Sequence, residues 1–150
     1  MNTIIALKGR RKIGKTQTIR TVDELLRAKY PDATVEHERR TKVELRVVLN
    51  VSGVKIGIES QCSRLINESL KLFVTLGCEI IICATRTSGG TFTAVNALPG
   101  HEVVWLEQHA QSAPFEQVLS NLATARHIVE ETEKALAAAS PAVLSRAASA

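Results

Sequence analysis

Residues 3–16 read TIIALKGRRKIGKT, an apolar run followed by a basic, glycine-bounded loop. The β-branched residues that end at a glycine predict a buried strand. From residue 14 to residue 30 the apolar side chains recur on one face of a helix. Pro31 ends this helix, because the residue before a proline avoids the α region. The stretch therefore predicts a strand, a loop at its carboxyl end and a helix that opens directly from the loop.

The rest of the chain alternates expected strands and helices. Strands are predicted over 33–40, over 42–60 as a hairpin that turns at Ser52-Gly53, over 78–87 and over 102–108. Helices are predicted over 62–76, 91–98 and 115–138, the last able to face the sheet with Phe115, Val118, Leu119, Leu122, Ala125, Val129 and Leu136. This order predicts an α/β fold, a three-layer sandwich around a mostly parallel sheet with one antiparallel hairpin. We expect one domain over 1–138 and a flexible, small-residue tail over 139–150.

Positive charge is concentrated in the loop. The net charge is +4, and residues 8–20 contain six cations and no acid: Lys8, Arg10, Arg11, Lys12, Lys15 and Arg20. Aromatic residues make up only 3% of the chain, so platforms for stacking on nucleic-acid bases are scarce. A basic cluster centred on a glycine loop fits a phosphate ligand better, and a nucleic-acid partner is not favoured.

The sequence also restricts the compartment and the chemistry. No apolar run approaches the ~18 residues that span a bilayer, and the run Ile4–Leu7 is too short for a secretory signal. We therefore expect a cytoplasmic protein with no membrane partner. Cys62, Cys78 and Cys83 lack metal-ligand spacing, and the last two are expected in the core. The four histidines form no recognisable metal or catalytic group and are expected to be structural.

Residues 9–16 match the pattern GxxxxGK[ST] at every defined position. Glycines let the backbone approach an anion closely, successive N–H groups form a concave anion site, and the helix N-terminus favours negative charge. Lys15 would reach the β- and γ-phosphates, and the Thr16 hydroxyl would bind Mg²⁺. The predicted nucleotide-binding residues are Gly9, Arg10, Arg11, Lys12, Ile13, Gly14, Lys15, Thr16 and Gln17.

On these residues the chain resembles the P-loop nucleoside triphosphatases, most clearly over 3–28 and in topology elsewhere. The resemblance implies a nucleotide-binding α/β sheet, bound Mg²⁺ and phosphate contacts along residues 9–16. Arg10 stands where the ParA/MinD-like ATPases carry a second lysine, so the chain departs from that branch. Small GTPases carry [NT]KxD after a later strand, whereas residues 85–88 read TRTS and lack the carboxylate that pairs with guanine. ATP is the expected nucleotide by elimination, with other nucleoside triphosphates left open.

A P-loop enzyme also needs groups beyond the loop. Glu59 ends an expected strand and is our candidate for the carboxylate that holds Mg²⁺ together with Thr16. Gln61 is positioned to orient an attacking water, as a glutamine does in small GTPases. Arg86 ends another strand at the same expected edge of the sheet, where it would stabilise phosphate charge or form a loop salt bridge. The predicted catalytic residues are Lys15, Glu59 and Arg86.

Three functions remain open from the sequence. The first is an ATP hydrolase whose nucleotide state controls a partner, either another protein or a second copy of the chain. The second is a small kinase that moves the γ-phosphate to a nucleotide or metabolite, although no lid segment is evident. The third is a regulatory module that binds a nucleotide with little turnover.

Overall fold

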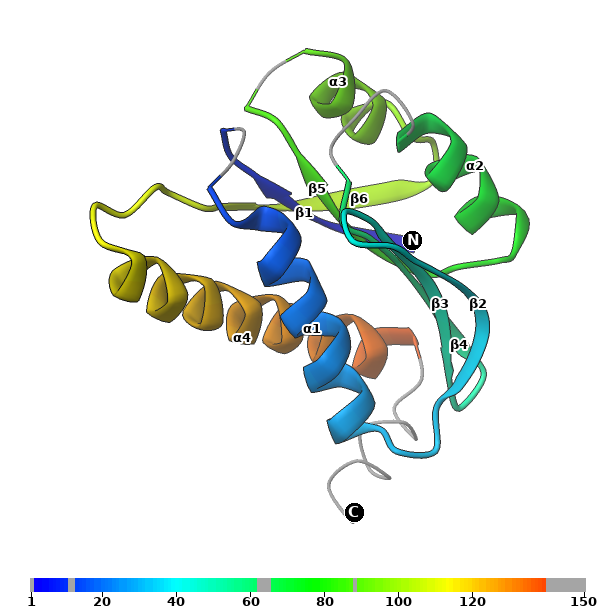
Figure 1. Ribbon diagram of the computed structural model, residues 1–150. Coiled ribbons are helices and arrows are strands. Elements are labelled where there is room, and N and C mark those ends of the chain that lie inside the picture. Colours follow the sequence, from blue (N-terminus) through cyan, green and yellow to red (C-terminus); the bar gives the residue numbers. More distant parts are fainter. Residues whose placement is uncertain (1, 11–12, 62–65, 88, 140–150) are drawn as a thin grey trace.

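The computed structural model describes residues 2–10, 13–61, 66–87 and 89–139 (Figure 1). In chain order the elements are β1 (Asn2–Lys8), α1 (Lys15–Lys29), β2 (Thr34–Arg40), β3 (Leu45–Val51), β4 (Val54–Glu59), α2 (Ile66–Thr75), β5 (Ile80–Thr85), α3 (Gly90–Asn96), β6 (His101–Glu107) and α4 (Pro114–Ala139). The predicted strands and helices are confirmed in kind and order. The first residues of the helix predicted over 62–76, and residues 140–150 of the predicted tail, lie outside the described residues.

The six strands form one mixed sheet in the order β2-β3-β4-β5-β1-β6. β1 pairs in parallel with β5 and β6, and β4 pairs in parallel with β5. β3 runs antiparallel to both β2 and β4, so the hairpin predicted within 42–60 is confirmed. Its turn lies at Ser52 and Gly53, where φ is 51° and 94°. Because β1, β4, β5 and β6 run in one direction, their carboxyl ends lie along one edge of the sheet.

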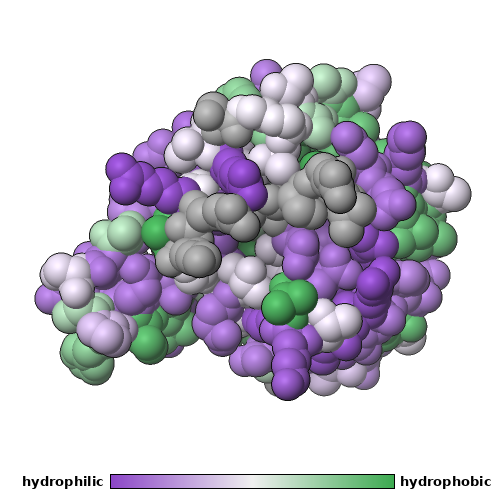
Figure 2. Space-filling model, turned by 45° about the horizontal axis from the view of Figure 1, so that its top comes forward, coloured by the Kyte–Doolittle hydropathy of each residue, from purple (hydrophilic) through white to green (hydrophobic). Residues whose placement is uncertain are grey.

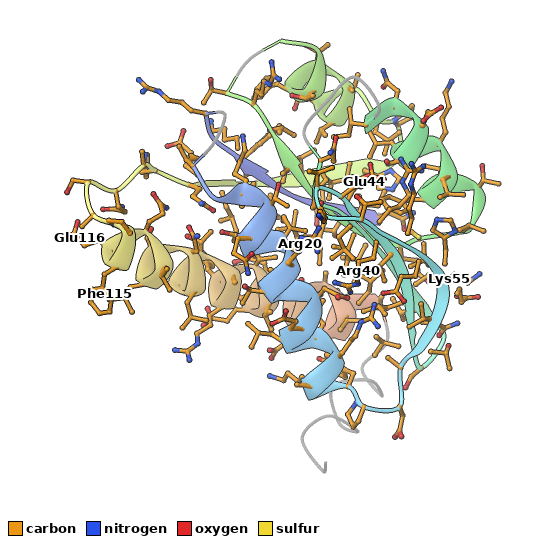
Figure 3. All side chains as sticks on the ribbon, in the orientation of Figure 1. Arg20, Arg40, Glu44, Lys55, Phe115 and Glu116 are labelled. Atoms are coloured by element: carbon orange, nitrogen blue, oxygen red, sulfur yellow. The ribbon has the colours of Figure 1, made fainter. Side chains whose placement is uncertain are left out.

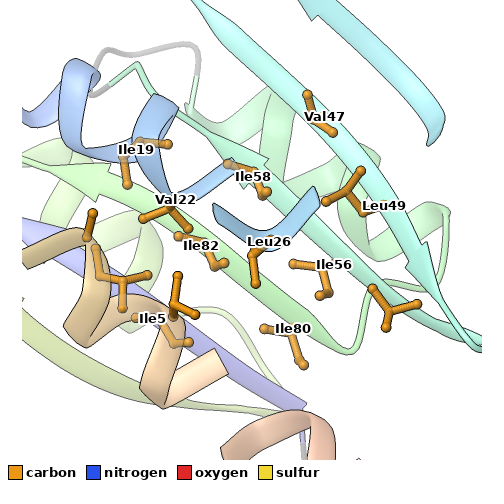
Figure 4. Packing of buried hydrophobic residues seen from close by; sticks show 14 of the residues in the cluster. Ile5, Ile19, Val22, Leu26, Val47, Leu49, Ile56, Ile58, Ile80 and Ile82 are labelled. Carbon is orange, nitrogen blue, oxygen red and sulfur yellow. The ribbon is translucent and has the colours of Figure 1, made fainter. Parts of the chain in front are cut away.

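Two hydrophobic clusters hold helices against opposite faces of the sheet. On one face, α1 contributes Ile19, Val22 and Leu26 and packs with α4 against residues such as Ile5 and Ile82 (Figure 4). The other face carries α2 and α3 and contains Ile4, Ala6, Val48, Ile66, Leu70, Phe73, Ile81, Cys83 and Val95. Consecutive strand residues therefore enter different clusters, as the twofold period of a strand requires. The predicted three layers are observed, and Cys78 and Cys83 are buried as expected.

The exposed edge strand β2 is tied to α1 by charges. The Asp23 carboxylate, 1% exposed, accepts hydrogen bonds from Arg27 at 2.9 Å and from Arg40 of β2 at 3.0 Å. Arg20 of α1 donates to the Thr41 carbonyl at 2.7 Å, just beyond β2. Figure 3 shows Arg20 and Arg40 between α1 and this edge of the sheet. These contacts fix α1, and with it the loop that precedes α1, relative to the sheet.

One expectation about α4 is wrong. Phe115, Val118 and Leu119 were expected to face the sheet, but they are 72%, 63% and 52% exposed. The reason is that α4 begins beyond the sheet, so its first turns have no layer beneath them (Figure 1). From Ala125 onward the expected apolar residues of α4 are buried. Within the described residues, no helix combines the length and apolar character that crossing a membrane requires.

The packing of α2 on β4 gives a stability prediction. A Cβ on Gly57 would lie 2.6–2.8 Å from three ring atoms of Phe73, which is fully buried. We expect Gly57→Ala to lower the free energy of unfolding by about 1–3 kcal/mol, because overpacking forces the ring or the strand to move. The measurement is urea unfolding. The control is Gly90→Ala, where a Cβ would meet no atom within 4 Å. Equal midpoints for the two variants would contradict the prediction.

Candidate functional site

The GxxxxGK[ST] loop leaves the sheet where β1 meets its two neighbours. Lys8, the last residue of β1, lies opposite Thr85 of β5 and Glu107 of β6. The Gly9 amide donates to the Thr85 carbonyl at 3.1 Å, and the Gln108 amide donates to the Lys8 carbonyl at 3.0 Å. The first residues of the loop are thereby anchored to both neighbouring strands, at the edge where the parallel strands end.

Lys15 is buried inside this anchor point. It is the first residue of α1 and only 4% exposed. Its ammonium group donates to the Gly9 carbonyl and, at 2.9 Å, to the Thr85 carbonyl. Burying an ammonium is costly unless hydrogen bonds replace its water, and these carbonyls supply such bonds. The loop is therefore arranged around an internal positive charge, which a solvated basic loop would not require.

The N-terminus of α1 faces the same loop. Gly14 is the N-cap residue, with φ 90° and ψ 14°, and it offers no side chain to bind the free N–H groups of the first turn. That turn contains no acidic residue. The dipole of this 15-residue helix therefore adds partial positive charge at the loop without a carboxylate to offset it. The Thr16 hydroxyl makes no hydrogen bond to another described residue. The first turn of α1 thus offers N–H donors and a hydroxyl beside the Lys15 ammonium.

A buried network that we call the polar brace supports the loop from behind: Thr18, Gln108, Gln117 and Asn121. Gln108 follows β6 and is 3% exposed. Its amide donates to the Ile13 carbonyl at 2.6 Å and to Asn121 Oδ1 at 2.8 Å, and its oxygen accepts from Thr18 at 2.6 Å. Gln117 of α4 also donates to Asn121 Oδ1, at 2.9 Å. The polar brace therefore links the loop to β6, α1 and α4.

At both glycines of the motif, a larger residue would collide with neighbouring atoms of the protein. A Cβ on Gly14 would lie 2.7 Å from Asn121 Nδ2, in the polar brace. A Cβ on Gly9 would lie 2.7 Å from Ile13 Cδ1 and 2.9 Å from the Gln108 carbonyl oxygen. From the sequence, we expected glycine at these positions because it lets the backbone approach an anion. The structure adds a second reason, which is that the backbone at Gly9 and Gly14 packs closely against Ile13, Gln108 and Asn121.

Glu59, the candidate metal ligand and catalytic residue, has protein partners. Glu59 is 1% exposed. Its carboxylate accepts hydrogen bonds from Arg46 Nε at 3.1 Å, from the Ser69 hydroxyl and from the backbone N–H of Gln61 at 3.2 Å. β5 lies between β1 and β4, so Glu59 is two strands, about 10 Å, from the strand that carries the loop. The carboxylate is part of an ion pair that connects β3, β4 and α2, and Thr16 is not among its partners.

The other predicted residues are placed as follows. Arg10, Gln17 and Arg86 are exposed. The backbone amide of Arg86 donates a hydrogen bond to the Thr91 hydroxyl of α3 at 3.0 Å. The Gln61 side chain donates to the Val43 carbonyl at 3.3 Å. Arg11 and Lys12 lie outside the described residues, so their predicted phosphate contacts have no structural counterpart here.

Thr85 is a site residue that the sequence did not single out. Besides holding Lys15 and Gly9 through its carbonyl, it is fully buried, and its hydroxyl has no hydrogen-bond partner in the described part of the chain. A buried hydroxyl without a partner is uncommon in native proteins. The only signal in the sequence was a polar residue ending an apolar strand. Nearby Cys83 is no nucleophile, because burial and, secondarily, the Glu59 carboxylate raise the pKa of its thiol to about 12.

A cavity of about 330 Å³ borders the loop on the side of β6. Its polar groups include Lys8 and Glu107, paired at 3.3 Å, and His109, which lies 3.5 Å from Glu107. The full lining is Lys8, Gly9, Arg10, Ile13, Thr87, Glu107, Gln108, His109 and Ala110. The volume is at the lower end of the range for small-molecule sites, so it has room for part of a ligand that is held by the loop. Figure 2 shows the face of the molecule that comes forward when the top of Figure 1 is turned toward the viewer, and hydrophilic residues are frequent on it.

Comparison of the chain with models of protein families, with curated proteins and with solved structures found no match. The site must therefore be judged on its own geometry. Among the residues that the structure describes, no three or more His, Cys, Asp or Glu side chains converge to hold a metal ion.

The polar brace can be tested through stability. Gln108→Ala leaves the Ile13 carbonyl, Asn121 and Thr18 without their shared partner. We expect the free energy of unfolding to fall by about 1–3 kcal/mol, the usual cost of leaving a buried polar group unpaired. The control is Gln111→Ala, because Gln111 is exposed. Denaturant unfolding measures the stability of both variants. An unchanged midpoint for Gln108→Ala would show that the polar brace does not stabilise the fold.

Proposed function

We propose that the chain binds a nucleoside triphosphate, ATP in the first instance, together with Mg²⁺, and hydrolyses it so that nucleotide state controls a partner. The observation that carries the proposal is the buried Lys15 ammonium inside a GxxxxGK[ST] loop, held at the ends of β1 and β5. This combination places a fixed cation where a helix N-terminus and a turn of backbone amides meet. A polyphosphate is the ligand whose charge matches it best.

Each part of the loop has a task in phosphate binding. The amides that follow Gly9 in the loop and those of the first turn of α1 would donate to phosphate oxygens, and Lys15 would add a charge-assisted hydrogen bond. The polar brace holds Ile13 and Gly14 at the end of the loop in place before the ligand arrives, which lowers the entropy lost on binding. The cavity beside Glu107 and His109 has room for the part of the nucleotide that extends beyond the phosphates.

Of the two predicted Mg²⁺ ligands, Thr16 is suited to bind the ion directly. Protein-bound Mg²⁺ usually keeps several waters and takes one or two protein ligands besides the phosphates. The Thr16 hydroxyl, with no hydrogen bond to another described residue, is suited to be one. Glu59 already accepts from Arg46, Ser69 and the Gln61 amide, so it would act on the ion through water. When bound, Mg²⁺ would neutralise part of the phosphate charge.

Hydrolysis is favoured over the two alternatives by the end of β5. The exposed Arg86 side chain directly follows Thr85, whose carbonyl holds Lys15. A guanidinium is suited to stabilise the negative charge of a phosphate there. A kinase would in addition need an acceptor site and a lid that excludes water. A binding module would not need such a group.

Phosphate release from ATP separates the three functions. The full chain is incubated with ATP and Mg²⁺, with and without nucleoside monophosphates as acceptors. Release without an acceptor is the expected result. Transfer only when an acceptor is present would favour the kinase, and tight binding with neither release nor transfer would favour the regulatory module. Absence of nucleotide binding would overturn all three functions.

Lys15 provides the sharpest test of binding. We expect Lys15→Ala to weaken ATP affinity by about one to two orders of magnitude, because a charge-assisted hydrogen bond contributes roughly 1.5–3 kcal/mol. Titration calorimetry measures the affinity, and circular dichroism shows that the variant is folded. Lys71→Ala, which removes an exposed lysine of α2, is the matched control and should bind as the wild type does. Equal affinity of the two variants would contradict phosphate binding at this loop.

Thr85 provides a separate test. Thr85→Val keeps the shape and removes a hydroxyl that has no partner in the described protein, so stability should be unchanged or raised by about 1 kcal/mol. Urea unfolding measures the change. The control is Thr93→Val at an exposed position of α3, where no buried hydroxyl is removed. A clear loss of stability in Thr85→Val would contradict the prediction and indicate that the hydroxyl has a partner.

A further inference from the structure

The first turns of α4 carry an apolar surface that we call the α4 stripe: Phe115, Val118, Leu119 and Leu122. Phe115, Val118 and Leu119 are 72%, 63% and 52% exposed, and Leu122 is partly buried. Residues three and four apart are neighbours on a helix, so the stripe is continuous. Figure 3 shows Phe115 at the projecting start of α4, pointing away from the sheet. Contiguous apolar surface of this kind on a soluble chain marks an interaction site.

The stripe ends in a cation. Arg126 lies one turn beyond Leu122, is exposed, and forms no hydrogen bond or ion pair with another described residue. Phe115, Leu119, Leu122 and Arg126 follow one another at spacings of four, three and four, which aligns them along one side of the helix. One end of this line is therefore an exposed aromatic ring, and the other is a guanidinium that has no partner among the described residues.

These features are self-complementary about a twofold axis. We infer that the α4 stripe docks a second copy of this chain, with the two α4 helices antiparallel and the axis between Leu119 and Leu122. Leu119 of each copy then faces Leu122 of the other. Phe115 and Arg126 are equally far from the axis, so each ring meets the guanidinium of the other copy. In a twofold interface a contact between two different residues occurs twice, so each dimer contains two such pairs.

The chemistry of this pairing favours a second copy as the occupant. An arginine over an aromatic ring adds about 0.5–2 kcal/mol, depending on how far it is desolvated. The pairing covers the apolar residues and gives Arg126 a partner at the same time. A membrane surface would cover the stripe and offer lipid phosphates to the guanidinium, but it would not use the matched spacing of Phe115 and Arg126 about a twofold axis.

The area of the interface sets the expected strength. A standard interface buries about 800 Å² on each partner, more than four side chains provide. Beyond the stripe, however, Arg126 borders a groove between α1 and α4 with a volume of about 570 Å³, lined by Leu25, Ala28, Lys29, Arg126, Val129, Glu130 and Glu133. Contact across both gives the second copy a larger surface. We expect a reversible dimer whose population rises with protein concentration.

Sedimentation velocity of the full chain over a range of concentrations tests this inference. The wild type should shift from monomer to dimer, and Leu119→Asp should remain monomeric, because it places two carboxylates beside the axis. Arg126→Glu should weaken the dimer at least tenfold, through loss of the contact with Phe115 and the new charges beside the apolar stripe. The matched control is Val74→Asp on α2, where an exposed valine lies on the other face of the sheet.

The variants should fold, since the substituted side chains are exposed, and thermal unfolding checks this. A wild type that stays monomeric at every concentration would overturn the inference, and so would a dimer that survives Leu119→Asp. Sedimentation of the wild-type monomer with lipid vesicles, or its binding to an amphipathic helical peptide, would assign the stripe to another occupant and likewise overturn it. None of these outcomes depends on nucleotide binding.

Discussion

The arrangement of the site depends on one buried cation. A buried ammonium group is costly unless it is hydrogen-bonded, so the backbone around Lys15 must provide carbonyl oxygens as acceptors. The carbonyls of Gly9 and Thr85 do so, and in consequence the start of the loop, the end of β5 and the first residue of α1 meet at one point. The parallel register of β1 and β5 makes this possible, because it brings Lys8 and Thr85 opposite each other at the same edge of the sheet. Sheet, loop and helix are thus joined through a charge rather than through apolar packing alone.

Most of the fold could be predicted from patterns within short segments. Apolar runs such as Ile80–Thr85, the hairpin with Ser52-Gly53 at its turn, and the helix that Pro31 terminates all express local rules. The orientation of the start of α4 could not be predicted in this way. Periodicity identifies which side chains share a face, but it does not state whether a second layer lies opposite that face. Phe115 and Leu119 have the spacing of core residues and project past the layer that would have buried them.

The site was predictable where it is contiguous in sequence and unpredictable where it is not. The loop motif located Lys15 and both glycines. The polar brace escaped prediction because Gln108 and Asn121 lie about a hundred residues from the loop, and an isolated amide residue has no distinctive pattern. Glu59 was found by its place at a strand end. Its choice as a metal ligand rested on the absence of an aspartate there, and a pattern of strand residues cannot reveal that Arg46 and Ser69 already bind the carboxylate.

The hydrogen bond from Gln108 to the Ile13 carbonyl has a consequence for the direction of a neighbouring group. A trans peptide unit is planar, and its C=O and N–H bonds point in opposite directions. Because Gln108 binds the Ile13 oxygen, the N–H of Gly14 in the same unit points to the opposite side, away from the Gln108 amide. A glutamine that follows the edge strand β6 thereby sets which way this peptide unit faces. The partial positive charge of the Gly14 N–H adds to the turn without any charged side chain.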